Sequence, residues 1–162
     1  MRQYKPMDIF TAAEKGEIGT ITELLSADPD LVAKHREDGW TALHLASYYG
    51  HPEAAGLLLA RGADVSLRSS NSMENTPLHA AVAGRQFELV KLLLENGIDV
   101  NATQHGGWTA LHGAAQNGDA RLTALLLANG ARRDAMSENG GTALSLASAA
   151  GHAEIVELLS RK

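Results

Sequence analysis

Apolar residues along this chain come in short clusters at a regular interval. Three leucine triplets stand at residues 57–59, 92–94 and 125–127, and a glycine follows each triplet three residues later. The residues around the triplets, as in 88–95, place apolar side chains three or four positions apart, a spacing typical of an amphipathic helix. Because glycine readily adopts the left-handed conformation that ends a helix, each triplet is predicted to lie near the end of a short helix.

A second recurring pattern lies ahead of each triplet. Thr-x-Leu-His-x-Ala begins at Thr41, Thr76 and Thr109, and a fourth copy with serine in place of histidine begins at Thr142. Threonine is a favourable N-cap residue, and Pro77 falls at the first helical position, where a missing N–H has no cost. The motif therefore predicts a first helix in each unit. Its predicted apolar stripe consists of Leu43, Leu78, Leu111 and Leu144, each with the alanine three residues later.

The spacing of the motif predicts a stack of similar units. The four threonines are 35, 33 and 33 residues apart, and turn residues separate the units. A pair of such short helices cannot bury its apolar face alone and has to stack on neighbouring pairs. The period, the Thr-Pro-Leu-His-x-Ala motif and the segment Asn-Gly-Ile-Asp-Val-Asn-Ala at 96–102 closely resemble the ankyrin repeat. The resemblance covers nearly the whole chain. It implies an all-α solenoid of stacked helix-turn-helix units with β-hairpin-like loops.

We expect one domain over residues 1–162, built from about five repeats. The predicted boundaries are an N-terminal capping repeat at 7–37, full repeats at 38–72, 73–105 and 106–138, and a C-terminal capping repeat at 139–162. Two positions depart from the pattern of the other units. Gly84 stands one position early, which leaves Arg85 where other units have glycine, and Glu74 replaces the glycine expected two residues before Thr76.

Composition narrows the possible partners. The net charge of −5 argues against nucleic-acid binding, which depends on clustered Lys and Arg. The chain has no cysteine, so disulfides and thiolate metal sites are excluded. No run approaches the roughly 18–20 apolar residues of a membrane helix, and residues 1–6 lead into a polar segment rather than a signal peptide. We therefore expect a cytoplasmic protein, monomeric and without a membrane partner.

The recurring histidines suggest a metal site or a catalytic row, but their spacing argues against both. Packed helices lie about 8–10 Å apart, whereas ligands of one zinc ion each lie about 2 Å from it. The resemblance implies instead that each histidine hydrogen-bonds with the motif threonine and the backbone of a loop. The residues expected to have this structural role are Thr41, His44, Thr76, His79, Thr109, His112 and Thr142. Two further histidines, His51 and His152, follow helix-turn glycines and are predicted to make local turn contacts.

No other catalytic or cofactor motif is present. The glycine pairs 106–107 and 140–141 lack the Lys-Ser/Thr of a phosphate-binding loop, and the acidic residues are scattered over predicted helix surfaces. We therefore expect no enzyme activity, no cofactor and no metal. The segment 94–101 resembles the setting in which ankyrin asparagines are hydroxylated in animal cells, which would make Asn101 a modification site. A loop-stabilising role for Asn101 is the preferred interpretation.

The resemblance implies that a partner protein binds the concave face, formed by loop tips and exposed positions of the first helices. Aromatic residues make up only 4% of the chain, yet both tryptophans and two of the three tyrosines fall at such positions. Interface hot spots are enriched in these residue types. The predicted partner-binding residues are Trp40, Tyr48, Tyr49, Asn75, Trp108, Gln116 and Asn117. The predicted loop tips are Glu37, Asp38, Arg68, Ser70, Met73, Glu74, His105, Ser137, Glu138 and Asn139.

Two interpretations of the aromatic residues remain open. They form one patch around Trp40, Tyr48, Tyr49 and Trp108 with polar contacts beside it, or each ring lies flat on its neighbouring unit as local packing. The predicted function is a non-enzymatic protein–protein interaction module, acting as an adaptor or as a regulator or inhibitor of an unidentified protein. The alternative is a self-associating structural or scaffold protein.

Overall fold

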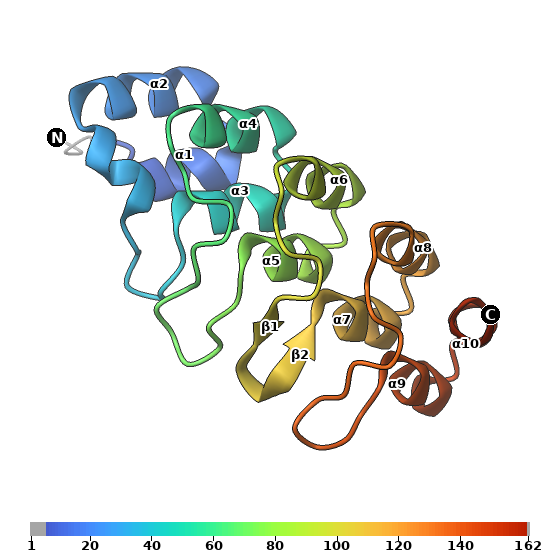
Figure 1. Ribbon diagram of the computed structural model, residues 1–162. Helices are drawn as coiled ribbons and strands as arrows, with labels where there is room; N and C mark the ends of the chain where they lie inside the picture. The colour runs from blue at the N-terminus through green and yellow to red at the C-terminus, as the bar shows by residue number, and fades with distance from the viewer. Residues whose placement is uncertain (1–5, 162) are drawn as a thin grey trace, which may run out of the picture.

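The computed structural model describes residues 6–161; the predicted absence of a signal peptide in residues 1–5 lies outside the described residues. Within residues 6–161 the chain folds into ten α-helices arranged as five consecutive pairs (Figure 1). Their bounds are α1 Ile9–Lys15, α2 Ile18–Ala27, α3 Ala42–Tyr49, α4 Pro52–Ala60, α5 Pro77–Ala83, α6 Phe87–Glu95, α7 Ala110–Asn117, α8 Ala120–Ala128, α9 Ala143–Ala150 and α10 Ala153–Ser160. A 3-10 helix, Pro29–Ala33, follows the first pair.

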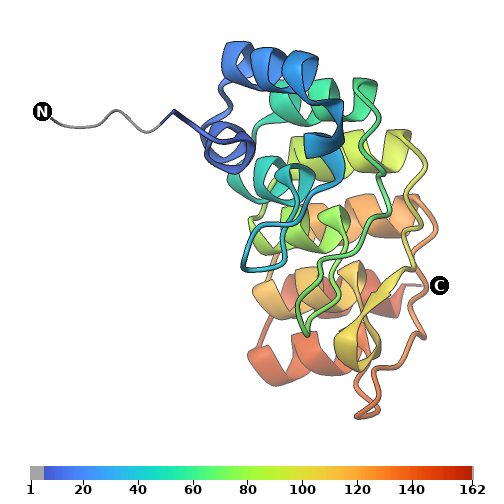
Figure 2. The same cartoon turned by 90° about the vertical axis from the view of Figure 1, so that its left-hand side faces the viewer.

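The helices form two layers, and the chain passes from one to the other within each pair. Helices α1, α3, α5, α7 and α9 pack side by side in an inner layer, and α2, α4, α6, α8 and α10 in an outer layer (Figures 1 and 2). The loops between pairs extend past the inner layer (Figure 1). This arrangement confirms the predicted all-α solenoid.

The motif threonines begin the inner helices as the pattern predicts. Thr41, Thr76 and Thr109 each accept a hydrogen bond on the side-chain oxygen from the backbone N–H three residues later. In return, the ring nitrogen Nδ1 of the motif histidine accepts from the threonine N–H, over 3.0–3.3 Å. Such a capping box satisfies backbone groups that a helix start otherwise leaves unpaired. Thr142 has the same arrangement with Ser145 as its partner.

The early glycine of the third unit has a packing reason. Gly50, Gly118 and Gly151 end their helices in the left-handed conformation, and in the third unit Arg85 takes that conformation with a φ of 58°. Gly84 is right-handed, but a Cβ built there would overlap the carbonyl oxygen of Tyr48 on α3. Glycine at this position therefore permits the close approach of α5 to α3.

The loops are hairpins, as the resemblance implies. In three of them, a backbone N–H near the loop start donates to a carbonyl just before the next motif threonine, each over 2.8 Å: Arg36 to Trp40, Ser69 to Asn75, and Ser137 to Gly141. The remaining hairpin forms two short antiparallel strands, β1 Thr103–Gln104 and β2 Trp108–Thr109, joined by the 3-10 turn His105–Gly107. Neighbouring loops are bonded in turn by Ser70 N–H to Gly39, His105 N–H to Met73 and Glu138 N–H to Gly106.

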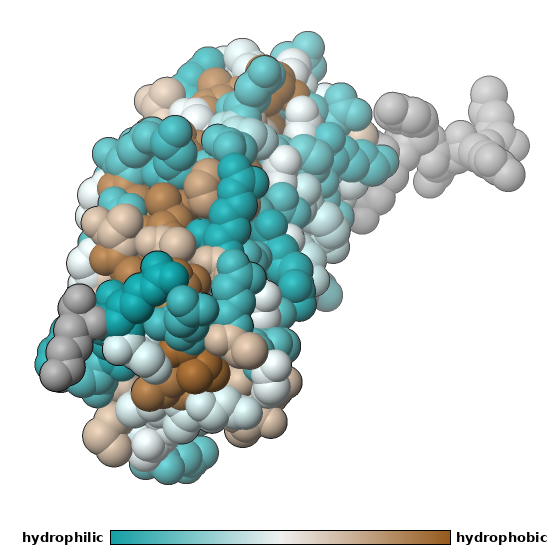
Figure 3. All heavy atoms as spheres, turned by 90° about the vertical axis from the view of Figure 1, so that its right-hand side faces the viewer, coloured by the Kyte–Doolittle hydropathy of each residue, from teal (hydrophilic) through white to brown (hydrophobic). Residues whose placement is uncertain are grey.

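The apolar stripe of the motif lies in a core that extends from Ile9 to Leu159. Leu43, Leu78 and Leu111 are at most 1% exposed. Leu144 departs from the prediction at 37% exposure, because among the described residues no helix packs on the far side of α9. On the side that carries α6, α8 and α10, apolar side chains are visible in separate areas divided by hydrophilic ones (Figure 3).

Candidate partner-binding surface

The motif histidines hold successive repeats together. The ring nitrogen Nε2 of His44 donates to the carbonyl oxygen of Asn75 over 2.9 Å, and that of His79 to Trp108 over 3.1 Å. His112 bonds in the same way to Gly141 over 3.0 Å. Since Nδ1 already accepts from the motif threonine, both nitrogens of each ring are engaged. The structure thus places each imidazole against the two groups that the resemblance implies.

Burial keeps two of these rings neutral. His44 is fully buried and His79 is 7% exposed. Burial lowers the pKa of each imidazole from 6.5 to about 4, and the hydrogen bond to the carbonyl of the next repeat offsets only part of this effect. A neutral ring with both nitrogens occupied cannot act as a general base or bind a metal without breaking contacts between repeats.

A second set of bonds joins the repeats at the opposite ends of the inner helices. Nε2 of His51 donates to the carbonyl of Glu14 over 2.6 Å, and Nε2 of His152 to the carbonyl of Gln116 over 3.1 Å. The prediction of local turn contacts for His51 and His152 is therefore wrong, because both rings reach the preceding repeat. A Cβ at Gly16 would lie only 2.6 Å from Nδ1 of His51, so glycine at this position makes room for the ring.

The two remaining junctions use other side chains for the same purpose. Gln86 donates to the carbonyl of Tyr48 over 3.2 Å, and Arg85 donates forward to the carbonyl of Asn117 over 2.8 Å. Asp119 occupies the position that corresponds to Gln86 in the next repeat. Its carboxylate instead caps α8 by accepting from the N–H of Leu122. These side chains have structural roles and are not free to bind a partner.

Asn101 also joins two repeats. Its Nδ2 donates to the carbonyl of Gly130 over 3.1 Å, and its Oδ1 accepts from the N–H of Arg132 over 2.9 Å. The side-chain amide is thus used at both ends, as expected for a loop-stabilising residue.

The predicted aromatic patch lies between the hairpin loops and the inner helices, where the structure divides it into two parts. Trp40, Tyr48 and Tyr49 form the first part. The Trp40 and Tyr48 rings meet edge to face at 5.5 Å between centroids, and the two tyrosines at 5.1 Å. Tyr48 is 36% and Tyr49 49% exposed, whereas Trp40 is half-buried against the core. These rings border a cavity of about 320 Å³, which we call the Trp40 cavity.

Charged groups beside the Trp40 cavity are already paired. Arg36 contacts the carboxylates of Glu14 at 2.5 Å and Asp38 at 2.6 Å. The hydrogen bond from Arg36 lowers the pKa of Asp38, and the two carboxylates raise the pKa of the guanidinium. Arg36 lines this cavity although the sequence pattern did not single it out, because its position depends on how the loop folds back towards α1.

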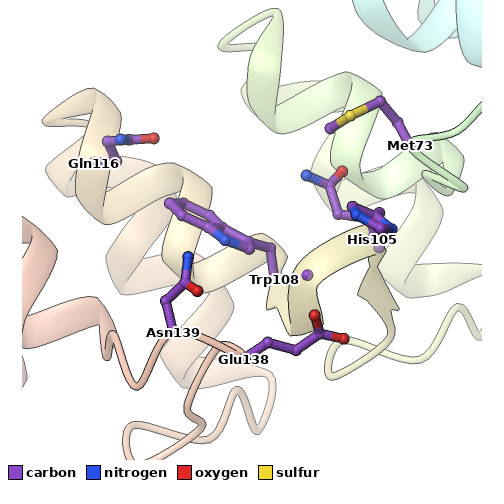
Figure 4. A pocket seen from close by; sticks show the side chains of 8 residues that line it. Met73, His105, Trp108, Gln116, Glu138 and Asn139 are labelled. Atoms are coloured by element: carbon purple, nitrogen blue, oxygen red, sulfur yellow. The ribbon is translucent and has the colours of Figure 1, made fainter.

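Trp108 forms the second part of the surface. Its indole is tilted against the ring of His112, 5.6 Å away. A cavity of about 230 Å³ beside it is also lined by Asn75, Gln116 and Asn117, so all the predicted polar contacts gather here. A neighbouring cavity of about 550 Å³ extends to the loop tips, as Figure 4 shows. The two cavities share lining residues, and together we call them the Trp108 groove.

The loop tips partly follow the prediction. Met73 is 45% exposed at the Trp108 groove, and His105, Glu138 and Asn139 line its outer part. Ser137 is wrong as a loop-tip contact, because it is 7% exposed and its hydroxyl accepts from the N–H of Gly141 inside the hairpin. Gln104 was missed, although its pairing with Trp108 across the hairpin brings it into the groove.

Across residues 6–161, no helix is long and apolar enough to cross a membrane. The same residues contain no cluster of three His, Asp or Glu side chains placed to hold a metal ion.

Comparison with known proteins agrees with the architecture. A family model described as ankyrin repeats (3 copies) matches residues 9–104 and 99–162. Among curated relatives, human transient receptor potential cation channel subfamily A member 1 is 39% identical over 116 residues, covering 68% of this chain and 10% of the channel subunit. Neurogenic locus Notch protein of Drosophila melanogaster is 38% identical over 90 residues, 55% of this chain and 3% of that protein. Rat ankyrin repeat and SAM domain-containing protein 6 is 35% identical over 98 residues, 60% of this chain and 11% of that protein. The chain thus matches only a small part of each of these relatives.

Proposed function

Because this chain belongs to the ankyrin-repeat family, which generally mediates protein–protein interaction, we propose that it is a non-enzymatic module that binds a partner protein. The partner occupies the surface between the hairpin loops and the inner helices. By binding the partner there, this chain acts as an adaptor, or as a regulator that blocks its target.

The observation that supports this proposal is the exposure of Tyr48 and Tyr49 beside the Trp40 cavity. Both side chains lie at the end of α3 and remain 36% and 49% exposed, although they are among the largest apolar groups of the chain. A tyrosine that becomes buried against a partner removes a large area from water at little entropic cost. Packing between repeats therefore leaves part of each ring exposed to solvent.

The histidines favour a binding role over a catalytic one. Those of the repeat motif are buried, and both ring nitrogens are bonded to backbone or threonine groups. The surface therefore presents aromatic, amide and carboxylate groups, which suit recognition of a protein.

Affinity capture from a lysate of the source organism tests the proposal. We compare the wild-type chain with a Tyr48→Ser/Tyr49→Ser variant and with a matched Lys91→Ala/Glu95→Ala variant on the outer helix α6. The proposal predicts a protein that is retained by the wild type and by the outer-helix variant and is lost by the tyrosine variant. Retention by all three would place the interaction elsewhere. A wild-type chain that dimerises and captures no other protein would favour self-association.

A further inference from the structure

The Trp108 groove has a chemistry different from that of the Trp40 cavity. Both of its cavities are lined by Met73, Gln104, Trp108 and Gln116, and the outer one adds the side chains of His105, Glu138 and Asn139. The side chains of Gln104, Gln116, Asn139 and Glu138 all carry oxygen acceptors. Among residues 6–161, neither lysine nor arginine contributes to the lining. The groove therefore combines the indole of Trp108 and the imidazole of His105 with oxygen acceptors and, among the described lining residues, one carboxylate.

The carboxylate of Glu138 has no ion pair among the described side chains, and the residue is exposed. Two arginines donate to backbone carbonyls of residues that line the groove or adjoin its lining. Arg85 donates to the carbonyl of Asn117, and Arg68 donates to the carbonyls of Glu74 and Thr103. At the Trp40 cavity, by contrast, Arg36 already neutralises the nearby acid.

The close-up view places these groups on two sides of one space. The indole of Trp108 lies between Gln116 and Asn139, and the carboxylate of Glu138 lies on the hairpin side, towards His105 (Figure 4). A long cationic side chain that runs along the indole would place its apolar stem on the ring and its head near these acceptors. The outer cavity, at about 550 Å³, falls within the usual size of ligand pockets.

We propose that the Trp108 groove binds an arginine side chain from an extended segment of the partner protein. The proposal rests on the proposed function and names the chemistry that the same surface recognises. A planar guanidinium stacks on an indole, and its five N–H donors match the amide and carboxylate oxygens of the groove. Its positive charge is complementary to Glu138 and to the net charge of −5.

Other occupants fit the groove less well. An apolar anchor would cover four side chains that carry acceptors and leave them without donors, which opposes binding. A phosphate or carboxylate group would face Glu138 without a free lysine or arginine in the lining to pair with it. A guanidinium both donates to these acceptors and brings the positive charge that pairs with Glu138.

The two tryptophans of the chain provide the test. Each gives one indole N–H signal in a two-dimensional ¹H–¹⁵N NMR spectrum, assigned with a Trp108→Phe variant. The full chain is titrated with N-acetyl-arginine amide, with the uncharged isostere N-acetyl-citrulline amide, and with N-acetyl-phosphoserine amide. We expect only the arginine compound to shift the Trp108 signal in a saturable way, while the Trp40 signal stays in place.

Removing the charge of Glu138 then tests arginine recognition separately from folding. Glu138→Gln should weaken binding of the arginine compound by up to about five-fold, since an exposed ion pair is worth up to about 1 kcal/mol, which corresponds to that factor. The matched Glu88→Gln variant on the outer helix α6 should bind as the wild type does. Both variants should keep the wild-type spectrum elsewhere, because neither carboxylate forms an ion pair among the described residues.

Four results would overturn the inference: no shift of the Trp108 signal, an equal shift with citrulline, a stronger response to phosphoserine, or unchanged affinity in Glu138→Gln. Each is distinct from failure of the proposed function. Capture of a tyrosine-dependent partner without arginine binding would leave the function standing and remove the arginine site. Arginine binding without any captured partner would leave the arginine site standing and remove the proposed function.

Discussion

Replacing Gly84 by alanine tests the closest approach between two repeats. Gly84 has a φ of −79° and a ψ of −3°, a conformation open to any residue, so the substitution introduces no backbone strain. A Cβ at this position would overlap the carbonyl oxygen of Tyr48 and lie 2.9 Å from the carbonyl carbon. Because the obstacle is backbone on α3, no side-chain rotation relieves the overlap, and α3 and α5 must move apart.

The expected loss follows from three contributions. Overpacking of this kind costs about 1–3 kcal/mol. The displacement also weakens the hydrogen bond from Gln86 to the same Tyr48 carbonyl, a loss of about 1 kcal/mol. Alanine restricts the unfolded chain and returns about 0.4–1 kcal/mol. We therefore expect Gly84→Ala to lower the free energy of unfolding by about 1–3.6 kcal/mol.

Urea unfolding, followed by both tryptophan fluorescence and far-ultraviolet circular dichroism, measures this loss. Gly56→Ala is the matched control, because Gly56 lies within α4 and a Cβ there would meet no atom within 4 Å. That control should be more stable than the wild type by about 0.5–1 kcal/mol. If Gly84→Ala were as stable as Gly56→Ala, the close contact between α3 and α5 would be refuted.

Three further predictions concern the core, pH and the contacts between repeats. Leu93 is fully buried, so Leu93→Ala should lower the free energy of unfolding by about 2–5 kcal/mol in urea titrations, whereas Leu144→Ala at the exposed site should cost far less. The folded-state pKa of His44 and of His79 is depressed to about 4, so the unfolded chain binds more protons than the folded chain. The contribution of the two neutral rings to stability is therefore complete above pH 6.5 and falls as the pH drops towards 4. We expect a loss of about 2 kcal/mol for each ring between pH 7 and pH 5. A urea midpoint that stays constant over that range would contradict this effect. His51→Ala should cost about 1 kcal/mol and speed amide hydrogen exchange in α1 and α2 before the other helices, and unchanged exchange there would remove its role between repeats.

The repeat unit could be predicted from sequence because the features that form it are local. A threonine cap, an apolar stripe and a terminal glycine each act within one helix, and their 33–35-residue spacing predicts the stack. The bonds of His51 and His152 to the preceding repeat were missed, although a signal was present. Counting from the motif threonine of each repeat, His51, Gln86, Asp119 and His152 occupy the same position, just as the motif histidines share theirs. Histidine recurs at this position in two repeats, and both histidines contact the preceding repeat.

The candidate surface was predicted less completely because it depends on how the loops fold back. The sequence placed the aromatic residues at exposed positions but could not show that Trp40 and Trp108 border different cavities. The position of Arg36 likewise follows from its ion pair with Glu14 on α1 and from its ion pair with Asp38 in the same hairpin loop. Such contacts depend on loop geometry, which no short motif specifies.

Site-specific photo-crosslinking tests the central claim most directly. A photoreactive benzoylphenylalanine replaces Tyr49 at the proposed surface in one variant and Lys91, exposed on the outer helix α6, in another. Both variants are irradiated in lysate or with the captured partner. We expect a covalent adduct with one partner protein from position 49 and none from position 91. An adduct from position 91 alone would contradict binding between the hairpin loops and the inner helices.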